Sequence, residues 1–302
     1  MQLEFSAPLP RPRLAVGLPS SLLEDCPTLR EKTVKLGLIG RACAVFRVDE
    51  VVVFKDSRSG ALDDSPLIKL ILDYMEAPQY LRRRLFRLRP ELRFAGLLPP
   101  LRTPHHPLES RLGALRSETL REGVVVRRRG AYCLVDVGLD KLVQVRAEGE
   151  LRPGSRVTVL VDPVCGRHRV ASPEEFGVYW GYRVVVLSEG LRGVRAASQA
   201  DFVVGTSRRG RLVSDPSVLK ELMGGLSRAE RVLVLFGSPR AGLFEIGEAE
   251  GIDLREACDV VANFIPDQGT RTVRTEEAVF SVLAIINFLA HLASSKTLLR
   301  SN

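Results

Sequence analysis

The pattern of apolar and polar positions predicts an α/β arrangement at the start of the chain. Residues 13–19 (RLAVGLP) form a short apolar run, and residues 28–46 repeat apolar positions at the spacing of an α-helix. Residues 51–54 are again continuously apolar, which is typical of a buried strand. Strand, helix and strand in this order predict a parallel α/β unit, because parallel strands need a long connection between them.

Two further segments follow at helical spacing. Residues 66–77 (PLIKLILDYMEA) predict an amphipathic helix. Residues 79–94 (QYLRRRLFRLRPELRF) interleave arginines with Leu and Phe. On a helix, this second pattern gives an apolar stripe with a dense basic flank.

From about residue 101 a Pro-rich linker leads into a segment with a different pattern of apolar and polar residues. Gly residues separate short alternating runs, which predict strands over 122–128, 131–138, 141–147, 156–162 and 167–171. Five short strands in about fifty residues are typical of a small closed barrel of the oligonucleotide-binding type. An insertion made of simple β-hairpins is the alternative that the pattern leaves open.

After residue 172 predicted strands and helices alternate again, so the barrel is expected to interrupt one larger domain. The spacing predicts strands over 183–187, 202–205, 231–236 and 259–265, and helices over 216–226 and 275–293. The expected domains are 1–103, the inserted barrel 104–173, and 174–302. The pattern alone does not give the order of the strands.

The net charge of +8 indicates a polyanionic partner, and nearly all of the positive charge is arginine. A guanidinium group binds phosphate with two parallel hydrogen bonds and stacks on bases. An arginine-biased genome or a heat-adapted host is the alternative explanation of the charge.

Cysteine and histidine give no sign of a metal centre. The five Cys and four His contain no CxxC pair and no HExxH pattern, so a metal enzyme is not expected. The scattered thiols suit a reducing cytosol.

The first residues lack the apolar core of a signal peptide, and the apolar stretch 278–293 is shorter than the roughly 20 residues of a membrane span. We therefore expect a soluble, cytoplasmic protein without a membrane partner.

Three glycine-containing loops follow predicted strands. They are VGTSRRG (204–210), LFGSPRAGL (235–243) and FIPDQGTRTVRTEEA (264–278). All are expected at the carboxyl edge of a parallel sheet, where open α/β sheets bind ligands. None matches GxGxxG or GxxxxGK[ST], which speaks against a nicotinamide or P-loop nucleotide site. Glycines at strand ends are commonly turn residues, but three such loops together favour a site in which backbone approaches a ligand closely.

The motifs with a family resemblance span nearly the whole chain. They are GLIGRACAVFRVDEVVVF (37–54), PQYLRRRLF (78–86), LRFAGLLPPL (92–101), EGVVV (122–126), GVYWGYRV (177–184), VGTSRRG, LFGSPRAGL and PDQGTRTVRTEEAV (266–279). On these motifs the chain resembles the SPOUT class of RNA methyltransferases, in the archaeal and eukaryotic branch with an inserted OB-like barrel. The resemblance implies an α/β fold with a deep trefoil knot near the C-terminus, S-adenosyl-L-methionine as methyl donor, ribosomal RNA as substrate, and a homodimer through the knot region.

The resemblance also implies roles for individual residues. The matching cofactor positions are Thr206, Phe236, Gly237, Gly242, Ile265, Pro266, Gly269, Thr270, Val273 and Thr275. Arg41 matches the arginine expected to handle the proton or charge of the accepting group, and Glu277 is expected to orient the substrate. The arginines expected to hold RNA are Arg82, Arg83, Arg84, Arg87, Arg127, Arg128, Arg271 and Arg274.

Structural alternatives stand beside these roles. Arg41 is equally explained as a helix arginine bound to phosphate or a carboxylate, and helix capping explains Glu276 and Glu277. Core packing is favoured over base stacking for Tyr179 and its aromatic neighbours in YWGY. For the whole protein, the main alternative is a non-catalytic RNA-binding or assembly protein that retains the fold.

Overall fold

The computed structural model describes residues 5–58, 60–147 and 149–300. The chain divides into two compact units, each of which draws on separated segments. The first contains Tyr74–Pro90 and Pro100–Gly181, together with the segment that ends at Leu9. The second contains Pro10–Asp73, Glu91–Pro99 and the chain from Tyr182 onward.

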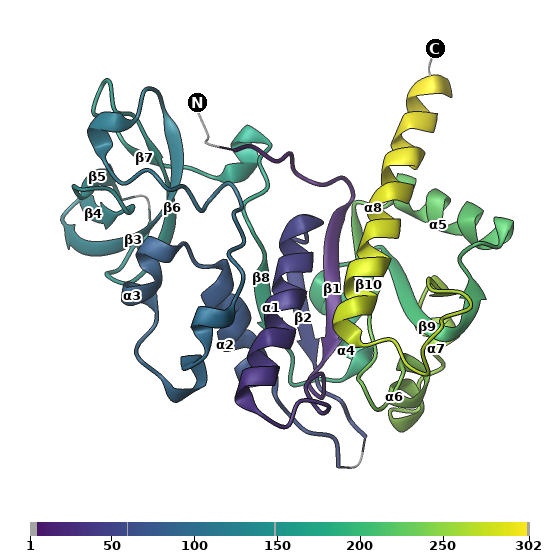
Figure 1. Cartoon of the computed structure of the whole chain (residues 1–302). Coiled ribbons are helices and arrows are strands. Elements are labelled where there is room, and N and C mark those ends of the chain that lie inside the picture. Colours follow the sequence, from purple (N-terminus) through teal and green to yellow (C-terminus); the bar gives the residue numbers. More distant parts are fainter. Residues whose placement is uncertain (1–4, 59, 148, 301–302) are drawn as a thin grey trace. The chain divides into compact units, whose positions relative to one another are not determined.

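The second unit is built on a six-stranded parallel sheet with the order β11-β9-β10-β1-β2-β8 (Figure 1). Its central strands are buried along their length, as expected for parallel strands covered on both faces. The strands are β1 (Arg13–Pro19), β2 (Glu50–Phe54), β8 (Arg183–Val186), β9 (Phe202–Leu212), β10 (Arg231–Leu235) and β11 (Val260–Asn263).

Seven α-helices of this unit lie between or after these strands in the described part of the chain. They are α1 (Leu29–Val45), α2 (Ser65–Glu76), α4 (Leu191–Ser198), α5 (Pro216–Arg228), α6 (Leu243–Ala249), α7 (Leu254–Ala257) and α8 (Thr275–Arg300). Apolar side chains of α4, α6 and α7 form one core cluster with the sheet. The long helix α8, yellow in Figure 1, packs along α1 and α5, where Phe46 and Phe280 meet edge to face at 6.3 Å.

Local sequence explains where these helices begin. Thr28 and Glu31 form a capping box at the start of α1, so two backbone N–H groups that have no helical partner are satisfied. Asp215 accepts from Ser217 N at the start of α5, and Pro216 takes the first helical position, where no N–H is needed.

The first unit contains the inserted barrel. Its antiparallel sheet has the order β5-β4-β3-β6-β7, and an isolated bridge between Val145 and His168 brings its two edges together. The strands are β3 (Thr119–Arg129), β4 (Tyr132–Asp136), β5 (Val143–Arg146), β6 (Arg156–Val161) and β7 (Arg169–Val170). Alternating valines and Cys133 fill the interior. The predicted mixed α/β architecture with a nearly closed, barrel-like sheet is confirmed.

The segment 79–94 does not form the single helix that its spacing suggested. It contains the 3-10 turn Gln79–Leu81, the one-turn helix α3 (Arg82–Leu85), the short turn Pro90–Leu92 and an extended Phe86. Pro90 lacks an N–H and restricts the residue before it to extended backbone, so a single helix cannot run through residue 90.

Helix α8 is longer than expected. It runs from Thr275 to Arg300, and its segment Thr275–Ser294 is long and apolar enough to cross a membrane by length and composition alone. One face of this segment is buried in the second unit through Val279, Leu283 and Ile286. A core helix of a globular unit has the same character.

Candidate active site

A cavity of about 320 Å³ lies where three segments of the second unit meet beyond the carboxyl ends of its strands. Open α/β sheets bind ligands at this edge, and the volume is within the range of small-molecule sites, roughly 300–1,000 Å³. The wall is formed by residues 206–209 of β9, 236–242 after β10, and by Glu245, Asn263, Phe264, Ile265, Gln268, Thr272, Val273, Thr275, Ala278 and Val282.

An irregularity in strand β9 brings its residues to the cavity. Val261 of β11 pairs with Gly205, but the next residue, Ala262, pairs with Arg211. The register thus skips residues 206–210, of which 206–209 line the cavity. Thr206 Oγ1 donates to Leu235 O at 2.8 Å, which ties this bulge to the end of β10.

The loop after β10 is held by its own backbone. Ser238 N donates to Ala241 O at 2.8 Å, and Ala241 N donates to Ser238 Oγ at 3.1 Å. A Cβ on Gly237 would lie 2.8 Å from Ala241 O and 2.9 Å from Gly242 Cα. This loop conformation therefore requires glycine at position 237.

The loop after β11 turns sharply before α8 begins. Ile265 N donates to Asn263 Oδ1 at 3.0 Å, and Asp267 adopts a left-handed backbone conformation with φ of 51°. Gln268 Nε2 then donates to Thr270 O at 2.8 Å. Thr275 Oγ1 donates to Gly237 O at 3.4 Å, so the loops after β10 and β11 are joined at the start of α8.

The structure brings most of the predicted cofactor positions to this wall. Thr206, Phe236, Gly237, Gly242, Ile265, Val273 and Thr275 line the cavity. Pro266, Gly269 and Thr270 are not among the described wall residues, and Gly269 and Thr270 are exposed beyond the turn at Asp267. Sequence reasoning missed the polar wall residues Ser238, Glu245 and Gln268.

Charged side chains surround the cavity. Glu245 forms an ion pair with Arg209 at 3.1 Å, and the Arg209 guanidinium lies 4.6 Å from the centre of the Phe244 ring. Arg208 donates to Arg271 O at 3.3 Å from the facing loop. The wall therefore combines apolar surface, backbone amides, hydroxyl groups and charges of both signs.

The two predicted catalytic residues lie outside this wall. Glu277 Oε2 accepts from Arg274 N at 2.9 Å, which is a capping contact at the start of α8. Arg41 is half-buried on α1, one turn beyond Leu38, and is not among the described residues of the cavity wall. The role of each stays a prediction.

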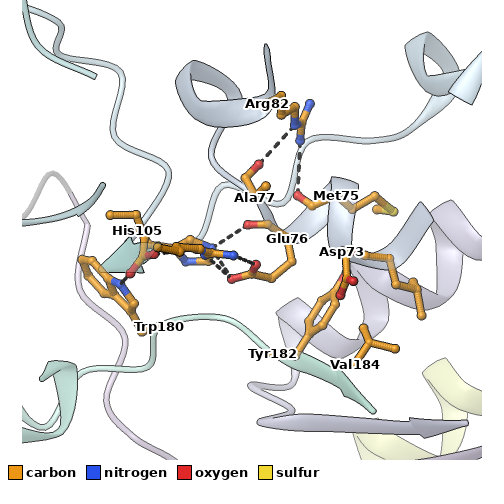
Figure 2. A network of polar contacts seen from close by, with 12 residues as sticks. Asp73, Met75, Glu76, Ala77, Arg82, His105, Trp180, Tyr182 and Val184 are labelled. Atoms are coloured by element: carbon orange, nitrogen blue, oxygen red, sulfur yellow. Dashed lines mark hydrogen bonds and ion pairs between the residues drawn. The ribbon is translucent and has the colours of Figure 1, made fainter. Parts of the chain in front are cut away.

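Seven of the eight predicted RNA-binding arginines are exposed, and Arg82 is half-buried. Arg82 instead folds back on the end of α2, where it donates to Ala77 O at 3.1 Å and to Met75 O at 3.2 Å (Figure 2). Two of the exposed guanidinium groups have partners among the described residues: Arg84 pairs with Asp136, and Arg128 donates to backbone carbonyls of neighbouring turns.

A buried polar network occupies the first unit (Figure 2). The Glu76 carboxylate accepts two hydrogen bonds from Arg156, at 2.5 and 2.9 Å, and lies 3.1 Å from His105 Nε2. Burial opposes ionisation of Glu76, but the hydrogen bonds from His105 and Arg156 outweigh it and lower its pKa to about 2. Arg156 also pairs with Glu122 at 2.6 Å, and Trp180 Nε1 donates to Glu122 at 2.8 Å.

One residue of the YWGY cluster, Trp180, belongs to this network. Tyr179 and Tyr182 are buried, and Trp180 is bound to the network rather than presented to a base. The expectation of core packing is confirmed for Tyr179 and Tyr182.

Comparison with known proteins gives the family. The model of a family described as "Putative RNA methyltransferase" matches residues 13–286. The human 28S rRNA (uridine-N(3))-methyltransferase is 34% identical over 307 residues, which cover 90% of this chain and 77% of the human protein. The Drosophila melanogaster protein of the same name is 33% identical, and the match covers 90% of this chain and 61% of that protein. An uncharacterised protein of the archaeon Haloarcula marismortui is 30% identical over 98% of its length.

These matches cover nearly all of both compact units, with the cavity and the barrel inside the matched region. The sequence-based prediction of an RNA methyltransferase is confirmed. The chain belongs to this family of RNA methyltransferases.

Proposed function

We propose that this protein transfers a methyl group from S-adenosyl-L-methionine to N3 of a uridine in ribosomal RNA. The cavity at the carboxyl edge of the parallel sheet, in a chain of an RNA methyltransferase family, carries the proposal. The names of the human and fly relatives support N3 of uridine as the accepting atom.

The cavity wall has the chemistry that this cofactor needs. Apolar surface from Phe264, Ile265 and Val282 suits an adenine ring, and the backbone of residues 236–242 offers hydrogen bonds to its edge. Glu245 offers an anion to the amino and sulfonium charges. When bound, the cofactor supplies a methyl group activated by positive sulfur, and the chain's task is to align the uridine nitrogen with it.

We assign the second unit to the SPOUT class, with the trefoil knot formed by the C-terminal part. The motifs 235–243 and 264–278, which the class would place in the knot, support this assignment because both follow strands of one parallel sheet and meet at one cavity. The barrel is assigned as an OB-like RNA-binding domain inserted at 104–173, and its five-stranded antiparallel sheet supports this.

We further propose that the protein acts as a homodimer in the cytoplasm. Large apolar side chains are exposed along α1 at Val34, Leu38 and Val45, and along α8 at Phe288 and Leu292. Helices α1 and α8 pack on each other, so these side chains belong to one helical layer. Exposed apolar surface of this kind is typical of a subunit interface.

A methylation assay tests the proposal. The purified protein and S-adenosyl-L-methionine are incubated with unmodified ribosomal RNA fragments, and mass spectrometry maps the product. N3-methyluridine at one position is expected. Salt-sensitive RNA binding without any methyl transfer would instead support the non-catalytic alternative.

A further inference from the structure

A second hollow lies directly beside the cofactor cavity, within the second unit. It is a cleft of about 960 Å³ that shares Pro239, Thr272 and Val273 with the cavity wall. Its other walls come from the start of α1 and from the first turn of α8. A group held in this cleft is therefore separated from a methyl donor in the cavity by only that shared rim.

Two oppositely charged side chains are buried in the cleft wall. Lys35 of α1 is 3% exposed, and Glu276 of α8 is 8% exposed. Lys35 Nζ donates to Asp25 Oδ1 at 2.6 Å and lies 3.5 Å from Glu276 Oε2. Among the described residues, Glu276 Oε2 is buried without a hydrogen-bond partner. A lysine ammonium has three N–H donors, so Lys35 retains donors besides the one given to Asp25.

The pair matches one edge of uracil. Uracil presents an N–H donor at N3 with a carbonyl acceptor on either side. Glu276 Oε2 forms an ion pair with Lys35 Nζ at 3.5 Å but accepts no hydrogen bond among the described residues, and Lys35 Nζ is a donor. Cytosine presents the reverse order, an acceptor at N3 beside an amino donor, and would meet like groups. A site that presents an acceptor beside a donor in this order discriminates against cytosine.

We propose that the target uracil enters this cleft, where Glu276 accepts the N3 proton and Lys35 donates to the adjacent carbonyl oxygen. The inference rests on the proposed uridine-N3 activity. As the N3–H bond breaks, its electron pair forms the new bond to the methyl carbon, and the carbon–sulfur bond breaks with its pair left on sulfur. The proton ends on the Glu276 carboxylate and then passes to solvent. Lys35 stabilises the negative charge that develops on the imide oxygen.

The other groups that face the cleft are consistent with this role. Its described charged lining, besides the pair, comprises Asp25, Arg30, Glu31 and Arg274. Burial, reinforced by Asp25, raises the pKa of the Cys26 thiol to about 11, so Cys26 is neutral at pH 7 and is not a nucleophile. Phe94 also lines the cleft, and the Arg93 guanidinium lies 5.1 Å from the centre of its ring.

The experiment compares the full-length wild-type protein with Glu276→Gln and Lys35→Met. Glu248→Gln, an exposed glutamate on α6, is the control for loss of a carboxylate. The first readout is binding, without cofactor, of RNA fragments that carry U or C at the target position, measured by fluorescence anisotropy. Wild type should prefer U, and both cleft variants should lose that preference by at least about fivefold while calorimetric affinity for S-adenosyl-L-methionine is unchanged.

The second readout is the single-turnover methylation rate against pH. Glu276→Gln should lower the rate by roughly 100-fold or more, as for other lost general bases, and its residual rate should rise with pH. RNA with 5-fluorouridine at the target should recover about tenfold in this variant, because the halogen makes the N3 proton more acidic. If the role of Glu276 were purely structural, the residual rate of Glu276→Gln would not rise with pH and would not recover with 5-fluorouridine.

The outcomes separate the two proposals. If wild type methylates uridine and Glu276→Gln stays within twofold of it with the same base preference, the cleft assignment is overturned and the activity stands. If wild type methylates no ribosomal RNA, the proposed function fails. A preference for U that is lost in both variants but kept in Glu248→Gln would still support the cleft as a uracil site.

Discussion

Replacement of Glu76 by Gln tests whether the buried network stabilises the first unit. Gln keeps the size of the side chain but removes its charge. One amide oxygen can still accept from Arg156, but the amide N–H₂ group then faces either the guanidinium or His105, which are donors. Arg156 keeps Glu122 as an ionic partner, so the charge of Arg156 is not left alone.

The magnitude follows from the pKa of Glu76, which is about 2 in the folded protein against an ordinary value of 4.5. Because the folded state holds the carboxylate ionised more strongly than the unfolded chain does, the stabilisation is complete above about pH 4.5 and is lost as the pH falls toward 2. The difference corresponds to about 3 kcal/mol at neutral pH. A loss of this size lowers Tm by roughly 10 °C.

Urea unfolding measures this effect directly. Trp180 is the only tryptophan in the chain and is bound to Glu122, so its fluorescence reports unfolding of the first unit. The control is Glu175→Gln, which weakens an exposed ion pair with Arg169 and should cost less than about 1 kcal/mol. If Glu76→Gln costs no more than this control, or if wild-type stability does not change between pH 5 and 2, the reasoning is refuted.

Three further predictions concern single contacts. Burial, together with the neighbouring His105, lowers the pKa of His106 to about 3. Below about pH 6.5 the unfolded chain therefore takes up a proton that the folded protein does not, and the free energy of unfolding should fall as the pH falls from 6.5 to 3. His106→Gln should flatten that part of the plot of urea midpoint against pH. Gly225→Ala would place a Cβ within 2.2–2.5 Å of the Phe202 ring, so a loss of about 1–3 kcal/mol is expected in thermal unfolding and an unchanged Tm would contradict the packing. Gly237→Ala should weaken calorimetric binding of S-adenosyl-L-methionine at least tenfold, whereas Gly96→Ala, with no described atom within 4 Å of the new Cβ, should bind as wild type does.

Regular elements were predicted well because their periodicity is set by burial on a sheet or helix face. Strand β1 has the expected bounds, 13–19, and all five barrel strands are present. Residues 79–94 show where periodicity fails. Leucine at helical spacing is compatible with a helix, but the backbone conformation also depends on a single proline and on local contacts of arginine side chains.

The cavity at the carboxyl edge of the sheet could be located from sequence, but its wall could not be completed. Glycine loops after buried strands indicated this edge, and seven of the ten predicted positions line the cavity. Gly269 and Thr270 are exposed although Gln268 and Thr272 beside them line the wall, and no periodic signal in the sequence marks this difference. Glu245 sits in the first turn of α6, where an acidic residue is ordinarily explained by helix capping.

The arginines illustrate why net charge does not identify the residues of an RNA-binding surface. Arg82 stands first in the basic run, yet its guanidinium binds two carbonyls at the C-terminal end of α2 and lies over the Tyr74 ring at 4.6 Å. A cation there satisfies carbonyls that have no helical partner. Arg156, the first residue of β6 in the barrel, is bound by two buried carboxylates. Such residues add to the net charge but offer little to a phosphate, so Arg83 and Arg87, exposed on the same segment as Arg82, are the better candidates for contact with RNA.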